Sequence, residues 1–237
     1  MRIFHVFDHS LPLHSGYTFR SRSILKAQHD LGWETLHVTG AKQGVQVAVE
    51  EADDLRFFRT PPSRFWSRIP LFNQWYIVHG LKRRLLALVK EHKPDVIHAH
   101  SPCLNGLAAA AVAKKMSIPL VYEVRAFWED AAVDHGTTQE GSLRYQLTRA
   151  LETRVFKQAD KVTCICEGLR RDIIARGIPA EKITVIPNAV DIEKFDVIAS
   201  KNAELEKSLG LNGKTVLGFL GSYYAYEGLD LLLKALK

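Results

Sequence analysis

The sequence predicts an α/β fold in which helices cover both faces of a parallel β-sheet, and three observations support that prediction. Short runs rich in Val and Ile alternate with longer segments whose apolar residues recur at helical spacing. Gly32 and Gly177 follow two of the longer segments as helix stops, and prolines stand just before or at the next segments. Of the 237 residues, 46% are hydrophobic and 24% are charged, a composition that can fill a large core.

Strands are expected in the short apolar runs, at residues 2–7, 35–39, 55–59, 95–99, 120–124, 161–165 and 183–186. Helices are expected between them, at residues 17–31, 72–91, 104–115, 143–158 and 168–176. In a sheet built this way, ligands bind beyond the carboxyl ends of the strands. Functional residues are therefore expected in the segments that follow the strands.

The alternation ends after Pro187, which divides the chain into three regions. Residues 1–187 are expected to form a complete α/β domain, and residues 188–211 a polar linker with a helix at 201–209. Residues 212–237 contain one further apolar run at 215–220 and a helix from Leu229. Since one strand and one helix cannot form a domain, this last region is predicted to be the first strand-helix unit of a second α/β domain.

Charge and missing motifs exclude several classes of protein. The net charge of +6 favours an anionic partner, namely a phosphate, an acidic lipid or nucleic acid. Nucleic acid is the least favoured of the three, because zinc-finger spacing, RNA-recognition signatures and a basic tail are missing. The sequence has neither G-x-G-x-x-G nor G-x-x-x-x-G-K-[ST], which disfavours nicotinamide-dependent dehydrogenases and P-loop nucleotidases. It also has no spanning apolar stretch or secretory signal, so a cytoplasmic location is expected.

The cysteines and the paired histidines do not predict a metal site. Cys164 and Cys166 lie two apart in an apolar run and would share one face of a strand, and with Cys103 they make an odd number. His98 and His100 share one side of another expected strand, but spacing places no third ligand beside them. His98 is predicted to be a buried, hydrogen-bonded histidine and His100 a substrate-binding residue in the cleft, with a metal pair as the less favoured alternative.

The first expected strand is followed by a candidate substrate-binding loop that contains His14, Ser15 and Gly16. A helix begins directly after it. The N-H groups at the start of a helix attract anions, and a glycine there lets a phosphate or a polar acceptor approach the backbone closely. The alternative is that Gly16 serves only the turn.

The segment after the expected strand at 120–124 carries the densest charge in the chain. Arg125 and Glu129 are its candidate catalytic residues. Glu129, Asp130 and Asp134 are alternatively the polar face of a short helix. Glu167 begins a later helix and is a candidate substrate-binding residue, or else a first-turn carboxylate that complements the helix dipole.

Aromatic and basic residues are mixed between residues 64 and 92. The segment includes Phe65, Trp66 and Arg68 and continues to the cluster Lys82, Arg83 and Arg84. A core-facing helix with a solvated basic face is the simpler interpretation. The functional alternative is a surface that docks on anionic lipid.

The sequence resembles glycosyltransferase family 4 along its whole length. The segments that carry the resemblance are PDVIHAH (94–100), IPLVY (118–122), ADKV (159–162) and VIPNAVD (185–191), followed by Phe195. Two longer strings, DHSLPLHSGYTFR (8–20) and VRAFWEDAAVDHG (124–136), are similar to the branch found with PEP-CTERM/exosortase A polysaccharide loci.

The resemblance implies a GT-B architecture, in which two Rossmann-like domains face each other across a cleft. The first domain would bind the acceptor and the second the nucleotide-sugar, and transfer would be retaining and independent of metal or other cofactors. Gly16 matches the loop that faces the donor phosphates and acceptor, and residues 188–191 match the interdomain hinge.

The sequence departs from the family pattern at several positions. Arg125 stands where many members have a histidine. The family's Gly-Arg and Lys-Gly phosphate clamp appears as Gly221-Ser222 and Glu227-Gly228, so Gly221 and Ser222 are candidate substrate-binding residues without the usual cation. The family's paired glutamates would lie beyond Lys237.

Together with the residue patterns, the resemblance implies a retaining glycosyltransferase that moves a sugar from a nucleotide-sugar to a glycan or lipid-linked acceptor in exopolysaccharide or cell-surface polysaccharide synthesis. Fixed cations and backbone N-H groups would stabilise the departing diphosphate. The enzyme is expected in the cytoplasm, either free or attached to the inner face of the membrane, and this chain alone is expected to be inactive. The alternatives are a non-catalytic glycan-binding module and, less favoured, a sugar-nucleotide epimerase or dehydrogenase.

Overall fold

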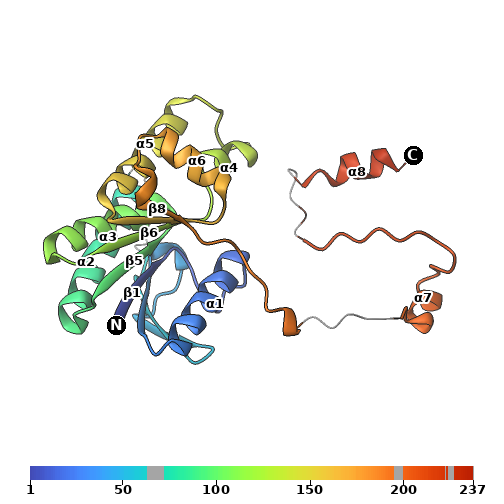
Figure 1. The fold of residues 1–237 in the computed structure, drawn as a ribbon, viewed down its shortest axis with the longest axis horizontal. Coiled ribbons are helices and arrows are strands. Elements are labelled where there is room, and N and C mark those ends of the chain that lie inside the picture. The colour runs from blue at the N-terminus through green and yellow to red at the C-terminus, as the bar shows by residue number, and fades with distance from the viewer. Residues whose placement is uncertain (63–71, 195–199, 222, 224–226, 237) are drawn as a thin grey trace. The chain divides into compact units, whose positions relative to one another are not determined.

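The computed structural model describes residues 1–62, 72–194, 200–221, 223 and 227–236. The chain divides into two compact units, Met1–Asn188 and Ala189–Lys237. The first unit is an α/β structure built on one sheet (Figure 1). The second contains the short helices α7 (Ala203–Ser208) and α8 (Leu229–Ala235), with a 3-10 turn at Ile192–Lys194.

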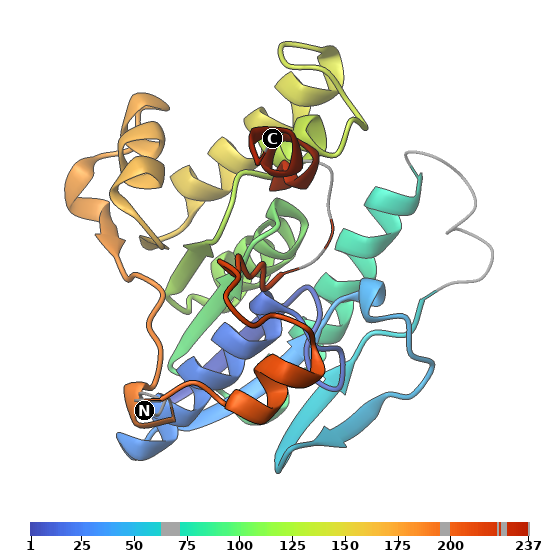
Figure 2. The ribbon, with the colours of Figure 1, turned by 90° about the vertical axis from the view of Figure 1, so that its right-hand side faces the viewer.

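The sheet of the first unit has the strand order β3-β4-β2-β1-β5-β6-β7-β8. Its strands are β1 (Arg2–Phe7), β2 (Glu34–Thr39), β3 (Val49–Ala52), β4 (Leu55–Arg59), β5 (Val96–His100), β6 (Leu120–Val124), β7 (Lys161–Cys164) and β8 (Ile183–Val185). All neighbouring pairs are parallel except β3 and β4. Figure 2 shows the β3-β4 pair at one edge of the sheet and β8 at the other.

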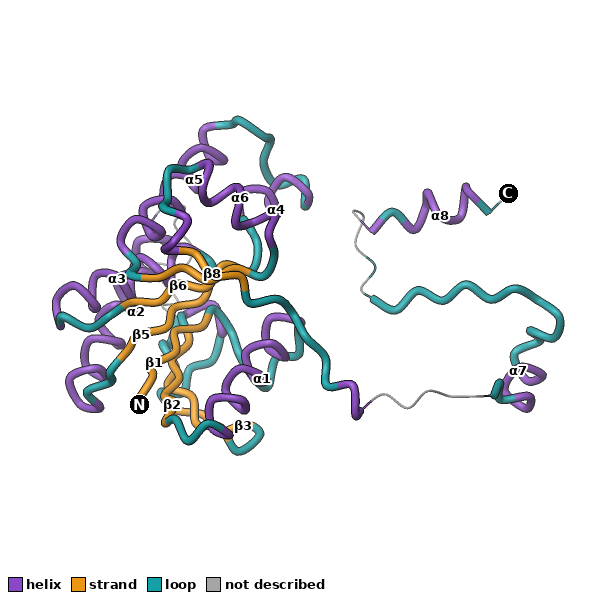
Figure 3. The backbone as a smooth tube through the Cα atoms, in the orientation of Figure 1, coloured by secondary structure: helices purple, strands orange, loops and turns teal. Residues whose placement is uncertain are grey.

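Helices flank this sheet on both faces, as the tube drawing in Figure 3 shows. They are α1 (Gly16–Asp30), α2 (Phe72–His92), α3 (Cys103–Met116), α4 (Trp128–Asp134), α5 (Leu143–Gln158) and α6 (Glu167–Ala175). Helices α2, α3 and α5 pack in a row through α3, while α1 packs on β2 from the other side. Within the described ranges, no helix has both the length and the apolar character that a membrane span requires.

The core lies between the sheet and α2, α3 and α5. Phe4, Ile97 and Tyr122 from the central strands are fully buried against alanines of α3. Helix α3 comes close to its neighbours because Gly106 has no side chain: an added Cβ would lie 2.4 Å from Val155 Cγ1 and 2.8 Å from Tyr122 Cε2. The small residues of α3 therefore set the distance between this helix, α5 and the sheet.

The expected α/β class and parallel sheet are confirmed. Three details of the secondary structure expected from the sequence are wrong. Residues 49–52 form the edge strand β3, which the sequence pattern did not predict, and the chain returns into β4 through Asp53 and Asp54, both at positive φ. Residues 215–220 form no strand, because a strand requires a hydrogen-bonded partner and the described part of this unit supplies none. Cys166 lies beyond β7, before α6, so it does not share a strand face with Cys164.

A buried carboxylate in α5, Glu152, gives the first prediction, which concerns the free energy of unfolding. Burial raises the pKa of Glu152 to about 7, although its hydrogen bond from Tyr122 opposes that shift. A carboxyl whose pKa is higher in the folded than in the unfolded state binds more protons when folded, so stability falls as the pH rises from about 4.5 through 7. We expect Glu152→Gln to be more stable than the wild type by about 3 kcal/mol at pH 8.5.

Urea unfolding at pH 4.5 and pH 8.5 measures this difference. At pH 4.5 the wild type and Glu152→Gln should be equally stable, because Glu152 is then protonated in the folded state. Glu181→Gln, at an exposed position, is the matched control and should change neither value. A difference between Glu152→Gln and the wild type that does not vary with pH would contradict the prediction.

Candidate functional site

The carboxyl ends of the parallel strands meet at one edge of the sheet, and the segments that follow them hold the candidate site. Strand β1 ends at Phe7, β4 at Arg59, β5 at His100, β6 at Val124 and β7 at Cys164. The loop after β1, residues 8–15, leads directly into α1. This is the edge at which ligands bind in open α/β sheets.

The start of α1 is exposed and has room for a ligand. Ser15 caps the helix, since its Oγ accepts a hydrogen bond from the Thr18 backbone N-H at 3.2 Å. Gly16 is the first helical residue, its φ lies outside the left-handed region, and a Cβ built on it meets no heavy atom within 4 Å. His14 is exposed, with its ring 5.6 Å from that of Phe19. The glycine is therefore not required by the turn, which favours the anion-site interpretation over the turn-only one.

An Asp-His-Ser contact lies at the same helix end. His9 Nε2 is 2.9 Å from Ser15 Oγ, and His9 Nδ1 is 3.3 Å from Asp8 Oδ2. The His9 ring stacks on the ring of Tyr17, with centroids 4.6 Å apart. Lys42 Nζ lies 3.4 Å from the other oxygen of Asp8. These contacts hold the His9 imidazole in one orientation next to Ser15.

A fully buried arginine fixes the middle of the loop. Arg59 donates hydrogen bonds to Ser10 Oγ at 2.6 Å and to the Leu11 carbonyl oxygen at 2.5 Å. It also donates to Thr39 Oγ1 and pairs with the carboxylate of Glu50. One guanidinium thus joins β2, β3 and β4 to the loop that precedes α1.

Glu123, in β6, is a buried carboxylate that holds two arginines. Its Oε1 accepts from Arg20 Nε at 2.7 Å and from Arg125 Nε at 3.0 Å. Burial alone would raise the pKa of Glu123, but the neighbouring His100, His98 and Arg125 hold that pKa well below its usual range. Arg20 further donates to the carbonyl oxygens of residues 186 and 187 and to Asn188 Oδ1, so it ties α1 to the end of the first unit.

Arg125 is almost fully engaged by the protein itself. Besides Glu123, it donates to the Tyr17 carbonyl oxygen at 2.6 Å, to Ser21 Oγ at 3.0 Å and to His100 Nδ1 at 2.9 Å. Its guanidinium also lies over the Tyr17 ring, 4.1 Å from the centroid. This arrangement favours a role in fixing α1 on the sheet edge over the expected role of Arg125 as a cation for the leaving diphosphate.

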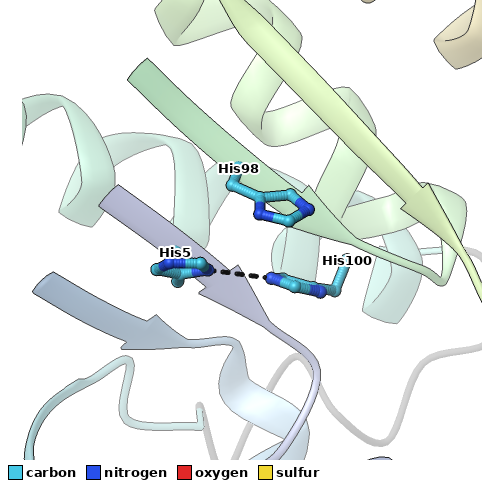
Figure 4. A group of neighbouring side chains, drawn as sticks. All are labelled: His5, His98 and His100. Atoms are coloured by element: carbon cyan, nitrogen blue, oxygen red, sulfur yellow. Dashed lines mark hydrogen bonds between the residues drawn. The ribbon is translucent and has the colours of Figure 1, made fainter. Parts of the chain in front are cut away.

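His5, His98 and His100 form a cluster on β1 and β5 (Figure 4). His5 Nδ1 and His100 Nε2 are 3.0 Å apart and hydrogen-bonded, and His5 Nε2 is 2.8 Å from Gln28 Oε1. The expectation for His100 is wrong in one respect: its side chain is fully buried, whereas His98, expected to be the more buried, is 13% exposed. The β5 strand continues to His100, so this side chain is covered by Phe7 and Arg125.

The third histidine that spacing did not reveal is His5, from the neighbouring strand. A metal would require one free lone pair from each ring directed at a common point. Burial lowers the pKa of His5 and of His100 well below the usual value, so both rings are neutral. Gln28 contacts His5 Nε2, and the His5 and His100 rings bond to each other. Arg125 and Glu123 both contact His100 Nδ1, so both ring nitrogens of His5 and of His100 are engaged. The cluster therefore favours a hydrogen-bonded chain of rings rather than a metal centre.

The two other candidate carboxylates lie in different surroundings. Glu129, in α4, is 1% exposed and its Oε1 lies 2.7 Å from Arg176 Nη2. This buried ion pair favours a structural role for Glu129. Glu167, the first residue of α6, is exposed, and its Oε2 lies 3.7 Å from Arg170 Nη1, as expected of a first-turn carboxylate.

The remaining candidates belong to other parts of the chain. Gly221 is exposed in the second unit, and Ser222 lies outside the described residues. Phe65, Trp66 and Arg68 also lie outside them. Within α2, Trp75 is 63% exposed and stacks on His79.

Sequence patterns did not single out Arg20, Glu123, Arg59 or His9. Glu123 carried a signal, because an acidic residue inside an apolar strand is buried at a cost unless it is paired. Its partner Arg20 lies 103 residues away in the sequence, and the partners of Arg59 lie 9 to 49 residues away. Spacing along the chain does not reveal contacts at such separations.

A family model described as a glycosyl transferase 4-like domain matches residues 15–189. Among curated proteins, the chain is 25% identical to the sulfoquinovosyl transferase SQD2 of Arabidopsis thaliana over 222 residues, which is 92% of this chain and 41% of that protein. It is also 25% identical to a GDP-mannose-dependent alpha-mannosyltransferase of Mycolicibacterium smegmatis over 226 residues, or 93% of this chain and 56% of that protein. The chain thus spans about half the length of these relatives.

Solved structures share the fold. Sucrose-phosphate synthase from Thermosynechococcus elongatus superposes with a TM-score of 0.71 at 14% identity, over 99% of this chain and 59% of the other. Anabaena HepE in complex with UDP gives a TM-score of 0.69 at 18% identity, over 100% of this chain and 57% of the other.

Proposed function

Because the chain belongs to the glycosyl transferase 4-like family, with a GT-B fold, we propose that it forms the acceptor-side part of a glycosyltransferase that uses a nucleotide-sugar. The observation that carries this proposal is the open start of α1 at the carboxyl edge of the sheet, where Gly16 leaves space in front of the helix N-H groups. Anabaena HepE, which shares the fold, binds UDP and UDP-glucose.

In the proposed reaction the nucleoside diphosphate leaves the anomeric carbon and the acceptor oxygen bonds to it. Backbone N-H groups and the positive end of the α1 dipole stabilise the anion that develops there. Protein atoms accept hydrogen bonds from Arg20, Arg59 and Arg125, so in this proposal these arginines stabilise the loops at the sheet edge. The substrate contacts the loop at Ser15 and Gly16. No metal or other cofactor has a role in this scheme.

The finer assignments of this proposal rest on the sequence resemblance. They are retention of anomeric configuration, the PEP-CTERM/exosortase A-associated branch, and a glycan or lipid-linked acceptor in exopolysaccharide or cell-surface polysaccharide synthesis. The proposed location is the cytoplasm, with attachment to the inner face of the membrane. The proposed domain organisation keeps residues 1–187 as the acceptor side, 188–211 as linker and 212–237 as the start of the donor side.

The test is release of nucleoside diphosphate from a panel of UDP- and GDP-sugars by a protein that contains this chain and extends it to the length of its relatives. Release that depends on an added acceptor is expected from the long protein. The 237-residue chain alone should release none, because it spans about half the length of the relatives. Glycan binding by the long protein without any release would instead support the non-catalytic alternative.

Membrane attachment gives a second prediction. If the basic residues of α2 dock on anionic lipid, each contributes about 1 kcal/mol near the surface, and salt screens that attraction. Arg84 already donates to the Ala48 carbonyl oxygen, so Lys82 and Arg83 are the freer cations. We expect binding to phosphatidylglycerol vesicles at about 50 mM salt and its loss at about 500 mM.

Vesicle co-sedimentation measures this binding. Lys82→Ala with Arg83→Ala should weaken it at low salt, whereas Lys114→Ala with Lys115→Ala, at the end of α3, is the matched control and should not. Binding that is absent, or that high salt leaves unchanged, returns α2 to the simpler interpretation of a packed helix with a solvated face.

A further inference from the structure

In the two hydrogen bonds that join Asp8, His9 and Ser15, the donor and the acceptor can be assigned. The Asp8 carboxylate only accepts, so the nitrogen next to it, His9 Nδ1, carries the hydrogen. His9 Nε2 is then the acceptor, and the hydroxyl of Ser15 donates to it across 2.9 Å. The tautomer of His9 is thereby set by Asp8.

Ser15 Oγ has one lone pair left for a ligand. It accepts one hydrogen bond, from the Thr18 backbone N-H, and gives its own hydrogen to His9, with Thr18 Oγ1 as the more distant alternative at 3.2 Å. Ser15 is half-buried and Gly16, beside it, is exposed, with no heavy atom within 4 Å of an added Cβ. The free side of the hydroxyl therefore opens to the same space as the start of α1.

We propose that Asp8, His9 and Ser15 form a proton relay for the acceptor hydroxyl. This inference rests on the proposed function and adds to it a residue that contacts the acceptor, Ser15, and two residues that act through it. The acceptor is a sugar or lipid-linked hydroxyl that donates its hydrogen bond to Ser15 Oγ.

The relay is balanced in protons and electrons. The acceptor oxygen forms a bond to the anomeric carbon, and the bond from that carbon to the diphosphate oxygen breaks, with its electron pair leaving on the diphosphate. The acceptor proton passes to Ser15 Oγ while the proton of Ser15 passes to His9 Nε2. The Asp8 carboxylate stabilises the imidazolium that results.

Tyr17 and Lys42 complete the surroundings of the relay. The Tyr17 ring stacks on His9 and its hydroxyl accepts a hydrogen bond from the Asp8 backbone N-H at 3.0 Å. Lys42 Nζ contacts Asp8 Oδ1, whereas the His9 imidazole contacts the other carboxylate oxygen, Oδ2. The orientation of all three relay residues is thus fixed before any ligand binds, which lowers the cost of reorganisation in the reaction.

The first test needs no substrate and uses the 237-residue chain. Long-range ¹H-¹⁵N NMR of the histidine rings reports which nitrogen carries the proton. For neutral His9 the relay requires a protonated Nδ1 and a bare Nε2. A His9 ring with its proton on Nε2 overturns the proposal, whether or not the protein is a glycosyltransferase.

The second test separates the relay from the helix cap, and uses the long protein with the donor that the panel identifies. Ser15→Asn keeps an N-cap oxygen but has no hydroxyl, whereas Ser15→Thr keeps both. We expect Ser15→Asn and His9→Gln to lower kcat about 100-fold with little change in KM for the donor, and Ser15→Thr to stay within about fivefold of wild type. His29→Gln, in the last turn of α1, is the control for loss of a histidine.

The outcomes separate this proposal from the proposed function. No turnover by the wild type counts against the glycosyltransferase assignment, and the relay falls with it. An active wild type together with a folded, fully active Ser15→Asn overturns the relay alone. Equal losses in Ser15→Asn and Ser15→Thr, at unchanged melting temperature, also overturn it, because a threonine hydroxyl can replace that of serine.

Discussion

Arg59→Met is expected to destabilise the first unit by about 3 to 5 kcal/mol, a magnitude typical of removing one partner from a buried ion pair. The methionine fills the volume of the arginine stem but removes the donor to Ser10 Oγ and to Thr39 Oγ1. The Leu11 carbonyl oxygen keeps only the longer hydrogen bond from Ser10 Oγ, at 3.2 Å. Each buried polar group left without a partner costs about 1 to 3 kcal/mol. For a unit of this size the melting temperature should fall by roughly 6 to 20 °C.

Thermal unfolding followed by circular dichroism measures this change. Arg56→Met, on the same strand, is the matched control: Arg56 is exposed and lies over the Phe58 ring, so its loss should shift the melting temperature by no more than about 2 °C. Arg59→Lys should lie between the two, since a lysine keeps the charge but not the fork of donors. A melting temperature of Arg59→Met within about 2 °C of wild type would show that the loop is not held by this residue.

The contrast between Arg56 and Arg59 shows what the sequence could predict. Both lie in a run of apolar and aromatic residues that indicates a strand, and β4 occurs at the expected residues. Alternation also places Arg56 and Arg59 on opposite faces of the strand. It does not say which face is closed by another segment, and the loop that covers Arg59 comes from the end of β1.

The helices could be predicted because their signals are local in the sequence, whereas the contacts of the candidate site could not. α5 occupies the expected residues 143–158, because its apolar spacing and the serine cap at residue 142 are local signals. Arg125 was singled out by the charge around it, but its partners Tyr17 and Ser21 lie on a helix more than 100 residues earlier. Arg125 reaches those partners because the strand order places β1 and β6 on either side of β5, which brings the segments after these strands together.

Two strand predictions were wrong because composition does not show whether a segment has a pairing partner. Residues 215–220 have the composition of a strand, yet a strand forms only when another pairs with it. Residues 49–52 do form a strand, although the two glutamates Glu50 and Glu51 make their composition untypical of one. This strand exists because β4 lies beside it and Glu50 pairs with Arg59. Composition alone therefore misjudges both segments.

Gly16→Val in the long protein is expected to reduce sugar transfer at least ~100-fold, about 2.7 kcal/mol of transition-state stabilisation. If the start of α1 meets a phosphate or acceptor oxygen, a branched side chain there blocks the approach. A loss of this size is comparable with removal of one oxyanion-hole donor. Diphosphate release at saturating and at low donor concentration measures it.

A loss of activity in Gly16→Val points to the site only if the variant is as stable as the wild type, and the structure predicts that it is. Gly16 has ordinary helical geometry, and an added Cβ meets no atom within 4 Å, so valine fits without displacing a neighbour. The melting temperature of Gly16→Val should therefore stay within about 2 °C of wild type, because valine is no worse than glycine in a helix. Gly16→Ala should give a smaller loss of activity, and Gly80→Ala, in α2, none. A Gly16→Val variant with full activity would remove this loop from the site, and one that melts early would assign the glycine to folding instead.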